Sequence, residues 1–319
     1  PPRSTLFPYT TLFRSAVSSE DALVRVTTQV RNAAEERSTV RIETSVYNAA
    51  DKKVASATVD GVALEGRVTS VTQEMTVRDP HLWSVEDPYL YRVVTEVISG
   101  QELTDRYETR AGIRSFYFDS DGGFFLNGKQ TRILGVCNHH DLGCLGAAVN
   151  TRAIERQLEI LREMGCNAIR TSHNPPAPEL LDLCDRMGFI VMDEAFDMWK
   201  VGKTDYDYHL DFDEWHRRDL EDMVLRDRNH PSVFIWSIGN EVMEQWERDG
   251  SGEALATGLA GIVRALDDTR PVTSACNDPT PGNPVLASGA LDLVGFNYHD
   301  SLWTGRSEER RVGKECRSR

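Results

Sequence analysis

Residues 151–194 read TRAIERQLEILREMGCNAIRTSHNPPAPELLDLCDRMGFIVMDE, and this stretch decides the fold. Two segments with helical spacing of apolar residues, 151–164 and 178–187, alternate with two short apolar runs, 168–169 and 190–192. Continuous apolar runs of this length are typical of strands buried on both faces, and an intervening helix makes such strands parallel. The stretch therefore predicts two strand–helix repeats of a parallel sheet.

The same alternation continues on both sides of this stretch. Further apolar runs lie at 133–136, 233–236, 271–273 and 291–296, and further amphipathic helices are expected at 214–226 and 252–266. Six such strands without a glycine-rich phosphate loop favour a (β/α)₈ TIM barrel over a nucleotide-binding sheet. Because six strands are two short of closure, we expect residues 116–304 to form an incomplete barrel whose last strands are missing.

Upstream, the period of the apolar pattern changes to two. Apolar and polar residues alternate at 24–30, 40–46 and 91–97, and turn-forming residues separate these runs. Several short alternating strands in about a hundred residues are typical of a β-sandwich. We expect residues 16–115 to form an immunoglobulin-like β-sandwich with a structural role.

The two ends of the chain differ from the rest. Residues 1–15 show no strand or helix period and contain no acidic group, while residues 305–319 are basic in an otherwise acidic chain. We interpret both as non-native segments rather than native polar tails, and exclude them from the expected fold.

Composition limits the partners. The chain has 319 residues and a formal net charge of -14, which would repel a nucleic acid. No apolar run is long enough to span a bilayer, so no membrane partner is expected. The six cysteines include no CxxC pair and no zinc-type spacing. The compartment, cytoplasm or periplasm, and assembly into a homo-oligomer are left open.

Polar residues follow the predicted strands of the barrel, at the end where barrel enzymes place their active sites. They are Asn138, His139, His140 and Asp141; Arg170, Thr171, Ser172, His173 and Asn174; Asp193 and Glu194; Gly239, Asn240 and Glu241; and Asn297, Tyr298 and His299. Together they would place acids, imidazoles and amides on one rim. Such a rim suits glycoside hydrolysis, which needs a protonated carboxyl and a second carboxylate.

Several of these segments resemble one enzyme family. GVCNHHDLG (135–143), the run 152–176, VMDEAFD (191–197) and RDRNHPSVFIWSIGNE (226–241) resemble the barrel of glycoside hydrolase family 2, which includes β-galactosidases and β-glucuronidases. HLWSVEDPYLY (81–91) and AGIRSF (111–116) resemble the end of the immunoglobulin-like domain of that family. The resemblance covers residues 16–304.

The resemblance implies a retaining exo-β-glycosidase, similar to a β-galactosidase, that works through a covalent glycosyl-enzyme. It implies that Glu241 is the general acid/base and that Asn240 contacts the sugar. It also implies that His173 binds substrate or stabilises the transition state, and that Tyr298 lies near a family tyrosine. We expect further substrate contacts from His140, Asn174 and Asp193. Neighbouring side chains on a strand point to opposite sides, so only one of His139 and His140, and one of Asp193 and Glu194, should face the site.

The chain departs from the family pattern in two places. The family nucleophile is a Glu at the end of strand seven, and the native pattern stops here after strand six. Glu308, Glu309 and Glu315 have no strand before them and are not expected to replace it. In the family a sugar-binding jelly-roll domain precedes the immunoglobulin-like domain, and we do not expect one within this sequence. We expect the chain as written to be inactive.

Other interpretations compete with this one. Glu241 alone could be a carboxylate that caps a helix N-terminus. The histidines suggest a metal-dependent barrel hydrolase, although no His-x-His pair supports it. A third alternative is a non-catalytic carbohydrate-binding protein. The expected partner is a β-glycoside or oligosaccharide whose sugar the sequence does not specify. No cofactor is expected, and a Mg²⁺ or Na⁺ ion in the intact enzyme is left open.

Overall fold

The computed structural model describes residues 4–18, 20–32, 38–64 and 68–299. It divides into two compact units. The first comprises residues up to 172 together with 176–193 and 222–234; the second comprises 173–175, 194–221 and the residues from 235 onward. The boundary crosses the barrel sheet, because strands β13 and β14 each contribute residues to both units.

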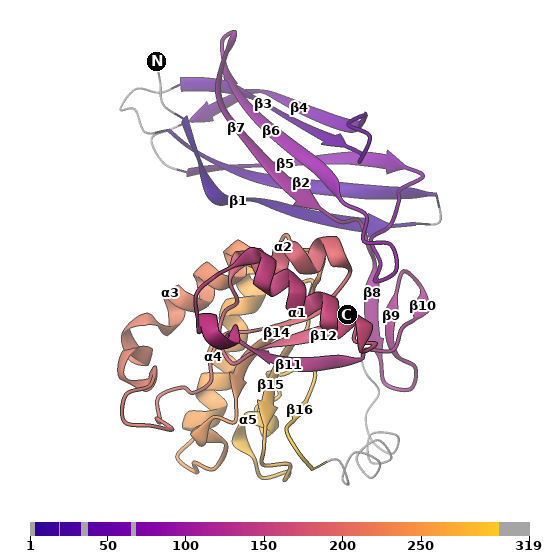
Figure 1. Ribbon diagram of the computed structural model, residues 1–319. Helices are drawn as coiled ribbons and strands as arrows, with labels where there is room; N and C mark the ends of the chain where they lie inside the picture. The colour runs from indigo at the N-terminus through magenta and orange to yellow at the C-terminus, as the bar shows by residue number, and fades with distance from the viewer. Residues whose placement is uncertain (1–3, 19, 33–37, 65–67, 300–319) are drawn as a thin grey trace. The chain divides into compact units, whose positions relative to one another are not determined.

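The N-terminal part of the first unit is a β-sandwich (Figure 1). One sheet has the order β1-β2-β5, formed by Ser4–Val17, Asp21–Asn32 and Val68–Arg78. The other has the order β4-β3-β6-β7, formed by Lys53–Leu64, Ser38–Tyr47, Tyr91–Ser99 and Glu102–Ala111. The alternate residues Val24 and Val26 of β2 pack with Val46 of β3 and Tyr91 of β6 in one core. The predicted immunoglobulin-like sandwich is therefore confirmed.

Strand β1 includes residues for which the sequence predicts no strand. Ser4–Val17 pairs antiparallel with β2, with an irregularity between Leu6 and Thr11. Phe13 is buried in the sandwich core, and its backbone N–H donates to Asn229 Oδ1 at 2.9 Å. The exclusion of this segment from the fold is thus corrected for residues 4–15, because backbone pairing with β2 compensates for their weak pattern; residues 1–3 lie outside the described residues. That these residues are non-native stays a prediction, and residues 305–319 lie outside the described residues.

A small sheet, also unexpected from the sequence, follows the sandwich. It has the order β10-β9-β8, formed by Lys129–Gln130, Gly123–Leu126 and Phe116–Asp119. Its strands have only two to four residues, too short for a period to be recognised. The Phe116 and Phe124 rings both pack edge-on against Phe234 of β14, so the sheet covers one end of a barrel strand.

The barrel sheet has six described strands in sequential order, β11 to β16. The pairs β11–β12, β12–β13, β14–β15 and β15–β16 are parallel. The strands are Gly135–His139, Ala168–Ser172, Ile190–Glu194, Val233–Asn240, Val272–Cys276 and Gly295–Phe296. All six expected strands are present, and the incomplete TIM barrel is confirmed.

The helices of the barrel also follow the sequence pattern. They are α1 (Thr151–Glu163), α2 (Pro178–Met187), α3 (His209–Asp227), α4 (Ser251–Leu266) and the short α5 (Pro284–Ala287), with 3₁₀ turns η1 (Gly143–Leu145) and η2 (Met243–Gln245). Helix α3 begins five residues before the expected 214. Among the described residues, no helix has the length and apolar character needed to cross a membrane.

Capping residues determine where helices α1 and α2 begin and end. The Asn150 side chain accepts a hydrogen bond from the Ala153 N–H and so caps α1. Helix α2 starts at Pro178 and ends before Gly188, whose φ of 72° is a conformation that favours glycine. A Cβ at Gly188 would lie 2.3 Å from the Val85 carbonyl oxygen, so a larger residue would clash. These signals explain why the predicted bounds of α2 agree with the structure.

Candidate active site

Strand β14 carries Asn240 and ends immediately before Glu241. All eight of its residues are buried, as expected for a strand covered on both faces. Its pairing with β15 is irregular between Ser237 and Asn240. Glu241 follows with a φ of 46°, in the left-handed region, and its N–H donates to the Ala275 carbonyl at 2.7 Å. Such a conformation is unfavourable for a non-glycine residue, and it sets the direction of the Glu241 side chain.

The Glu241 carboxylate is held by Asn297, which follows β16. Asn297 Nδ2 donates to Glu241 Oε1 at 2.6 Å and to Asn240 Oδ1 at 2.8 Å. The structure therefore joins Asn240 and Glu241 through a third residue, 56 positions away from Glu241. The residue that the sequence analysis selects from this segment is the next one, Tyr298, as a substrate contact that resembles a family tyrosine.

Tyr298 is 73% exposed, has a φ of 61°, and makes no hydrogen bond within the described residues. Its role in substrate binding stays a prediction. Asn297 is among the polar residues after the sixth strand, so the sequence identified the right segment. Whether Asn297 or Tyr298 faces Glu241 depends on side-chain direction, and a strand of two residues is too short for the sequence pattern to indicate that direction.

His173, after β12, is held by a buried carboxylate. Its Nδ1 lies 2.6 Å from Glu194 Oε1, and the Ser237 hydroxyl donates to Glu194 Oε2 at 2.6 Å. Glu194 is fully buried. The contact therefore occupies the Nδ1 side of the imidazole ring. This contact fixes the ring orientation and leaves Nε2 as the nitrogen for other partners.

Glu194 is not among the substrate contacts expected from the sequence, which include its neighbour Asp193. Both side chains are fully buried. Asp193 belongs to the first unit and Glu194 to the second, where it contacts His173. The substrate contact assigned to Asp193 stays a prediction. A His after one strand and a Glu after the next, as in RTSH and MDE, is a signal that could have suggested the pair.

The two remaining expected site residues are exposed. Asn174 Nδ2 donates to the Pro175 carbonyl at 3.0 Å, a local contact within its loop. His140 belongs to the first unit, and its Nε2 lies 3.1 Å from the Ala147 carbonyl oxygen. Their proposed roles in binding sugar stay predictions.

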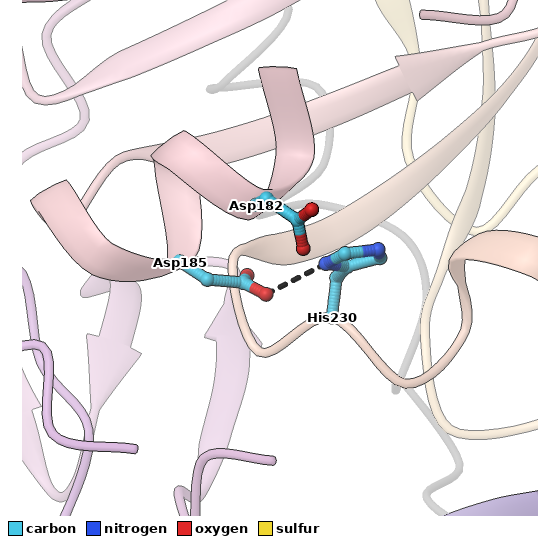
Figure 2. A group of neighbouring side chains, drawn as sticks. All are labelled: Asp182, Asp185 and His230. Carbon is cyan, nitrogen blue, oxygen red and sulfur yellow. Dashed lines mark hydrogen bonds and ion pairs between the residues drawn. The ribbon is translucent and has the colours of Figure 1, made fainter. Parts of the chain in front are cut away.

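One group of side chains in the first unit has the composition of a metal site. Figure 2 shows Asp182 and Asp185 on α2 beside His230, which precedes β14. However, both Asp185 oxygens already have protein partners: Oδ2 lies 2.6 Å from His230 Nδ1, and Oδ1 accepts from the Ser232 N–H at 3.0 Å. These contacts account for the group as an ion pair that anchors the loop before β14.

The ion pair predicts a pH dependence of stability. Burial opposes protonation of His230, but the nearby carboxylates, above all Asp185, outweigh it and raise the pKa of His230 above 6.5. A raised histidine pKa stabilises the folded protein below pH 6.5, and this contribution disappears as the pH rises through the folded-state pKa. The unfolding free energy of the unsubstituted protein should therefore fall as the pH rises above 6.5, and it should fall less in His230→Gln. Urea denaturation between pH 6 and 9 measures this difference.

His140→Gln is the matched control, since this histidine is exposed and its Nε2 lies against the Ala147 backbone carbonyl oxygen. It should leave the pH dependence of unfolding unchanged. An unchanged slope in His230→Gln would show that Asp185 does not bind a protonated imidazole.

Comparisons with known proteins agree with this geometry. The family model described as "Glycosyl hydrolases family 2, TIM barrel domain" matches residues 120–304, and "Glycosyl hydrolases family 2" matches residues 10–114. The chain is 51% identical over 315 residues to the β-galactosidase BoGH2A of Bacteroides ovatus, covering 90% of this chain and 37% of the relative. It is 37% identical over 230 residues to a putative β-glucuronidase of Formosa agariphila, covering 72% of this chain and 21% of that relative.

A solved structure also resembles this chain in fold. A crystal structure of a glycosyl hydrolase family 2 member from Bacteroides cellulosilyticus superposes with a TM-score of 0.91 at 38% identity. The match covers 96% of this chain and 39% of that protein. The chain therefore spans less than two fifths of the length of each of these relatives.

Proposed function

Because the chain belongs to glycoside hydrolase family 2, we propose that it is part of a retaining exo-β-glycosidase in which Glu241 is the general acid/base. The proposed substrate is a β-glycoside or oligosaccharide with a terminal β-galactose, since the relative with 51% identity is named a β-galactosidase. We propose that the reaction requires no cofactor.

The observation that carries this proposal is the 2.6 Å hydrogen bond from Asn297 Nδ2 to Glu241 Oε1. Because Oε1 accepts this hydrogen bond, a proton on the carboxyl group resides on Oε2. Oε2 can then donate the proton to the glycosidic oxygen as the bond to the sugar breaks. The same carboxylate can take a proton from water when the glycosyl-enzyme is hydrolysed.

Two other polar groups fit roles around the sugar. Asn240 is oriented by its contact with Asn297 and is the proposed partner of a sugar hydroxyl. Such a contact strengthens as positive charge develops on the ring. His173 has its Nδ1 committed to Glu194, so its Nε2 is the proposed contact to substrate.

A retaining mechanism also needs a nucleophilic carboxylate about 5–5.5 Å from the acid. Glu194 is a poor candidate, because both its oxygens are hydrogen-bonded, one to His173 and one to Ser237. We propose that the nucleophile follows a seventh strand that is not among the described residues. The chain as written should then bind a sugar without cleaving it.

This proposal predicts a difference between two proteins. The 319-residue chain should release nitrophenol from nitrophenyl β-galactoside at the background rate, whereas a protein carrying the complete barrel should turn over. Nitrophenyl β-glucuronide in parallel tests the sugar. Robust turnover by the chain alone would show that another carboxylate serves as nucleophile.

Two variations of the assay separate the alternatives. Treatment with a chelator should leave the activity of the complete barrel unchanged, and its loss would favour a metal-dependent hydrolase. Saturable galactose binding by a complete barrel that shows no turnover would favour a non-catalytic carbohydrate-binding protein.

A further inference from the structure

A lysine–aspartate pair contacts Asn240, the residue next to the proposed acid. Asp197 lies three residues after β13, and Lys203 follows in the same connecting segment. Lys203 Nζ lies 2.6 Å from Asp197 Oδ1 and donates to the Asn240 carbonyl oxygen at 2.8 Å. Asp197 Oδ1 also accepts from Asn240 Nδ2 at 2.8 Å. The pair thus holds both the backbone and the side chain of Asn240.

Asp197 determines which way the Asn240 amide faces. A carboxylate only accepts hydrogen bonds, so the NH₂ group of Asn240 must point toward Asp197. The amide oxygen then points toward Asn297, whose NH₂ group bridges Asn240 Oδ1 and Glu241 Oε1. If the Asn240 amide were flipped, two NH₂ groups would face each other and the bridge to Glu241 would be lost.

We propose that Asp197 and Lys203 are positioning residues that align the acid/base through Asn240 and Asn297. This inference rests on the proposed function only in taking Glu241 as the acid. Neither residue belongs to the polar residues that directly follow the apolar runs, and neither is among the expected site residues. They act without touching the reacting atoms.

The pair also balances charge beside the acid. The side chains of Lys203 and Asp197 are 23% and 34% exposed, so water screens them only in part. Together they are neutral. Without the Asp197 charge, the remaining ammonium would favour ionised Glu241, and without Lys203, the remaining carboxylate would favour protonated Glu241.

The backbone of the connecting segment is held by other contacts, so side-chain replacement should not release it. Asp207 Oδ2 accepts from the N–H groups of Lys203 and Thr204 at 2.8 and 2.7 Å. Glu244 Oε1 accepts from the Val201 N–H at 2.9 Å. The replacements Asp197→Asn and Lys203→Met should therefore change the charge and leave the backbone of the segment in place. In Asp197→Asn the side-chain amide oxygen can still accept a hydrogen bond from Asn240.

The second unit, which contains Glu241, has other titratable groups at or after its strand ends. They are His173 after β12, Glu194 in β13, Glu244 after β14, Cys276 and Asp278 at the end of β15, and Tyr298 and His299 after β16. All remain the same in every variant proposed here. Differences between variants therefore report the charges of Asp197 and Lys203.

The test is a carbon-13 NMR titration of glutamate side-chain carboxyls in the 319-residue chain, with Glu241 assigned by its loss in Glu241→Gln. Asp197→Asn should move the Glu241 titration midpoint to lower pH, and Lys203→Met should move it to higher pH, each by about half a pH unit or more. The double variant Asp197→Asn with Lys203→Met should return it close to the original value. Lys200→Met is the matched control, because this lysine pairs with Asp213 instead, and it should move nothing.

Shifts in the same direction for both single variants, or no shift in either, would overturn the proposal. If Lys203→Met fails to fold, Lys203→Gln gives the same charge change with a polar side chain. The titration needs no catalysis, so its outcome is independent of whether Glu241 acts as the acid, which is tested separately by substrate cleavage in Glu241→Gln.

Discussion

Glu241→Gln, in a protein that carries the complete barrel, is expected to lower kcat/KM for glycosides with poor leaving groups by about 10²- to 10⁴-fold. Gln keeps the shape of the side chain, and its carbonyl oxygen can still accept from Asn297 as Glu241 Oε1 does. What it loses is a proton acidic enough to transfer to the departing oxygen. The defect should therefore be chemical rather than structural.

The measurement is a series of aryl β-galactosides whose phenols differ in acidity. An acidic phenol leaves without protonation, so its cleavage should be lowered least in the variant. Glu253→Gln, at an exposed position in the first turn of α4, is the control and should match the unsubstituted enzyme. An equal loss for every leaving group would count against an acid role.

The second large effect concerns stability, and it arises at Asp267, which follows α4 and contacts Trp236 of strand β14. Asp267 Oδ2 accepts from Trp236 Nε1 at 3.0 Å and from Arg270 at 2.5 Å, while Oδ1 accepts from the Thr269 hydroxyl at 2.6 Å. Both Asp267 and Arg270 are buried. Asp267→Asn should lower the unfolding free energy by about 3–5 kcal/mol, because it removes the negative charge that lies against the buried Arg270 guanidinium.

The effect should depend on pH. Burial raises the pKa of Asp267, but Arg270 and Thr269 outweigh it and hold the pKa well below 3.8. A lowered carboxyl pKa stabilises the folded protein above pH 3.8, and this contribution is lost as the pH falls through the folded-state pKa. Urea unfolding should therefore show the full difference at pH 7 and a smaller one near pH 2.

Asp268→Asn is the matched control, since Asp268 is the exposed neighbour of Asp267. A change at such a position typically alters stability by less than about 0.5 kcal/mol. If Asp267→Asn lowered the unfolding free energy as little as Asp268→Asn, the Asp267–Arg270 pair would not be what stabilises this part of β14.

Much of the fold follows from local features of the sequence. The apolar runs at 190–192 and 233–236 lie within β13 and β14, and Pro178 with Gly188 bounds α2 as expected. The small sheet β8 to β10 and strand β1 were missed. Their strands are either very short or depend on pairing with a distant strand, so no local period marks them.

The candidate site divides in the same way. The sequence placed Asn240, Glu241 and His173 after strands, where the structure has them, because a βα repeat always ends its strand at the same edge of the sheet. It did not single out Asn297, Glu194, Asp197 or Lys203. Each of these residues contacts a partner at the end of another strand, and the two residues of each contact are 21 to 56 positions apart in the chain.

By itself, then, the sequence determined the class of fold, the order of its strands and the carboxyl group proposed as the acid. The period of apolar residues and the ends of helices are local properties, and neighbouring residues encode them. Tertiary structure alone decided which amide holds Glu241 and which carboxylate orients His173. Those contacts depend on the register between strands and on a backbone irregularity before Asn240, which act over distances that local spacing does not record.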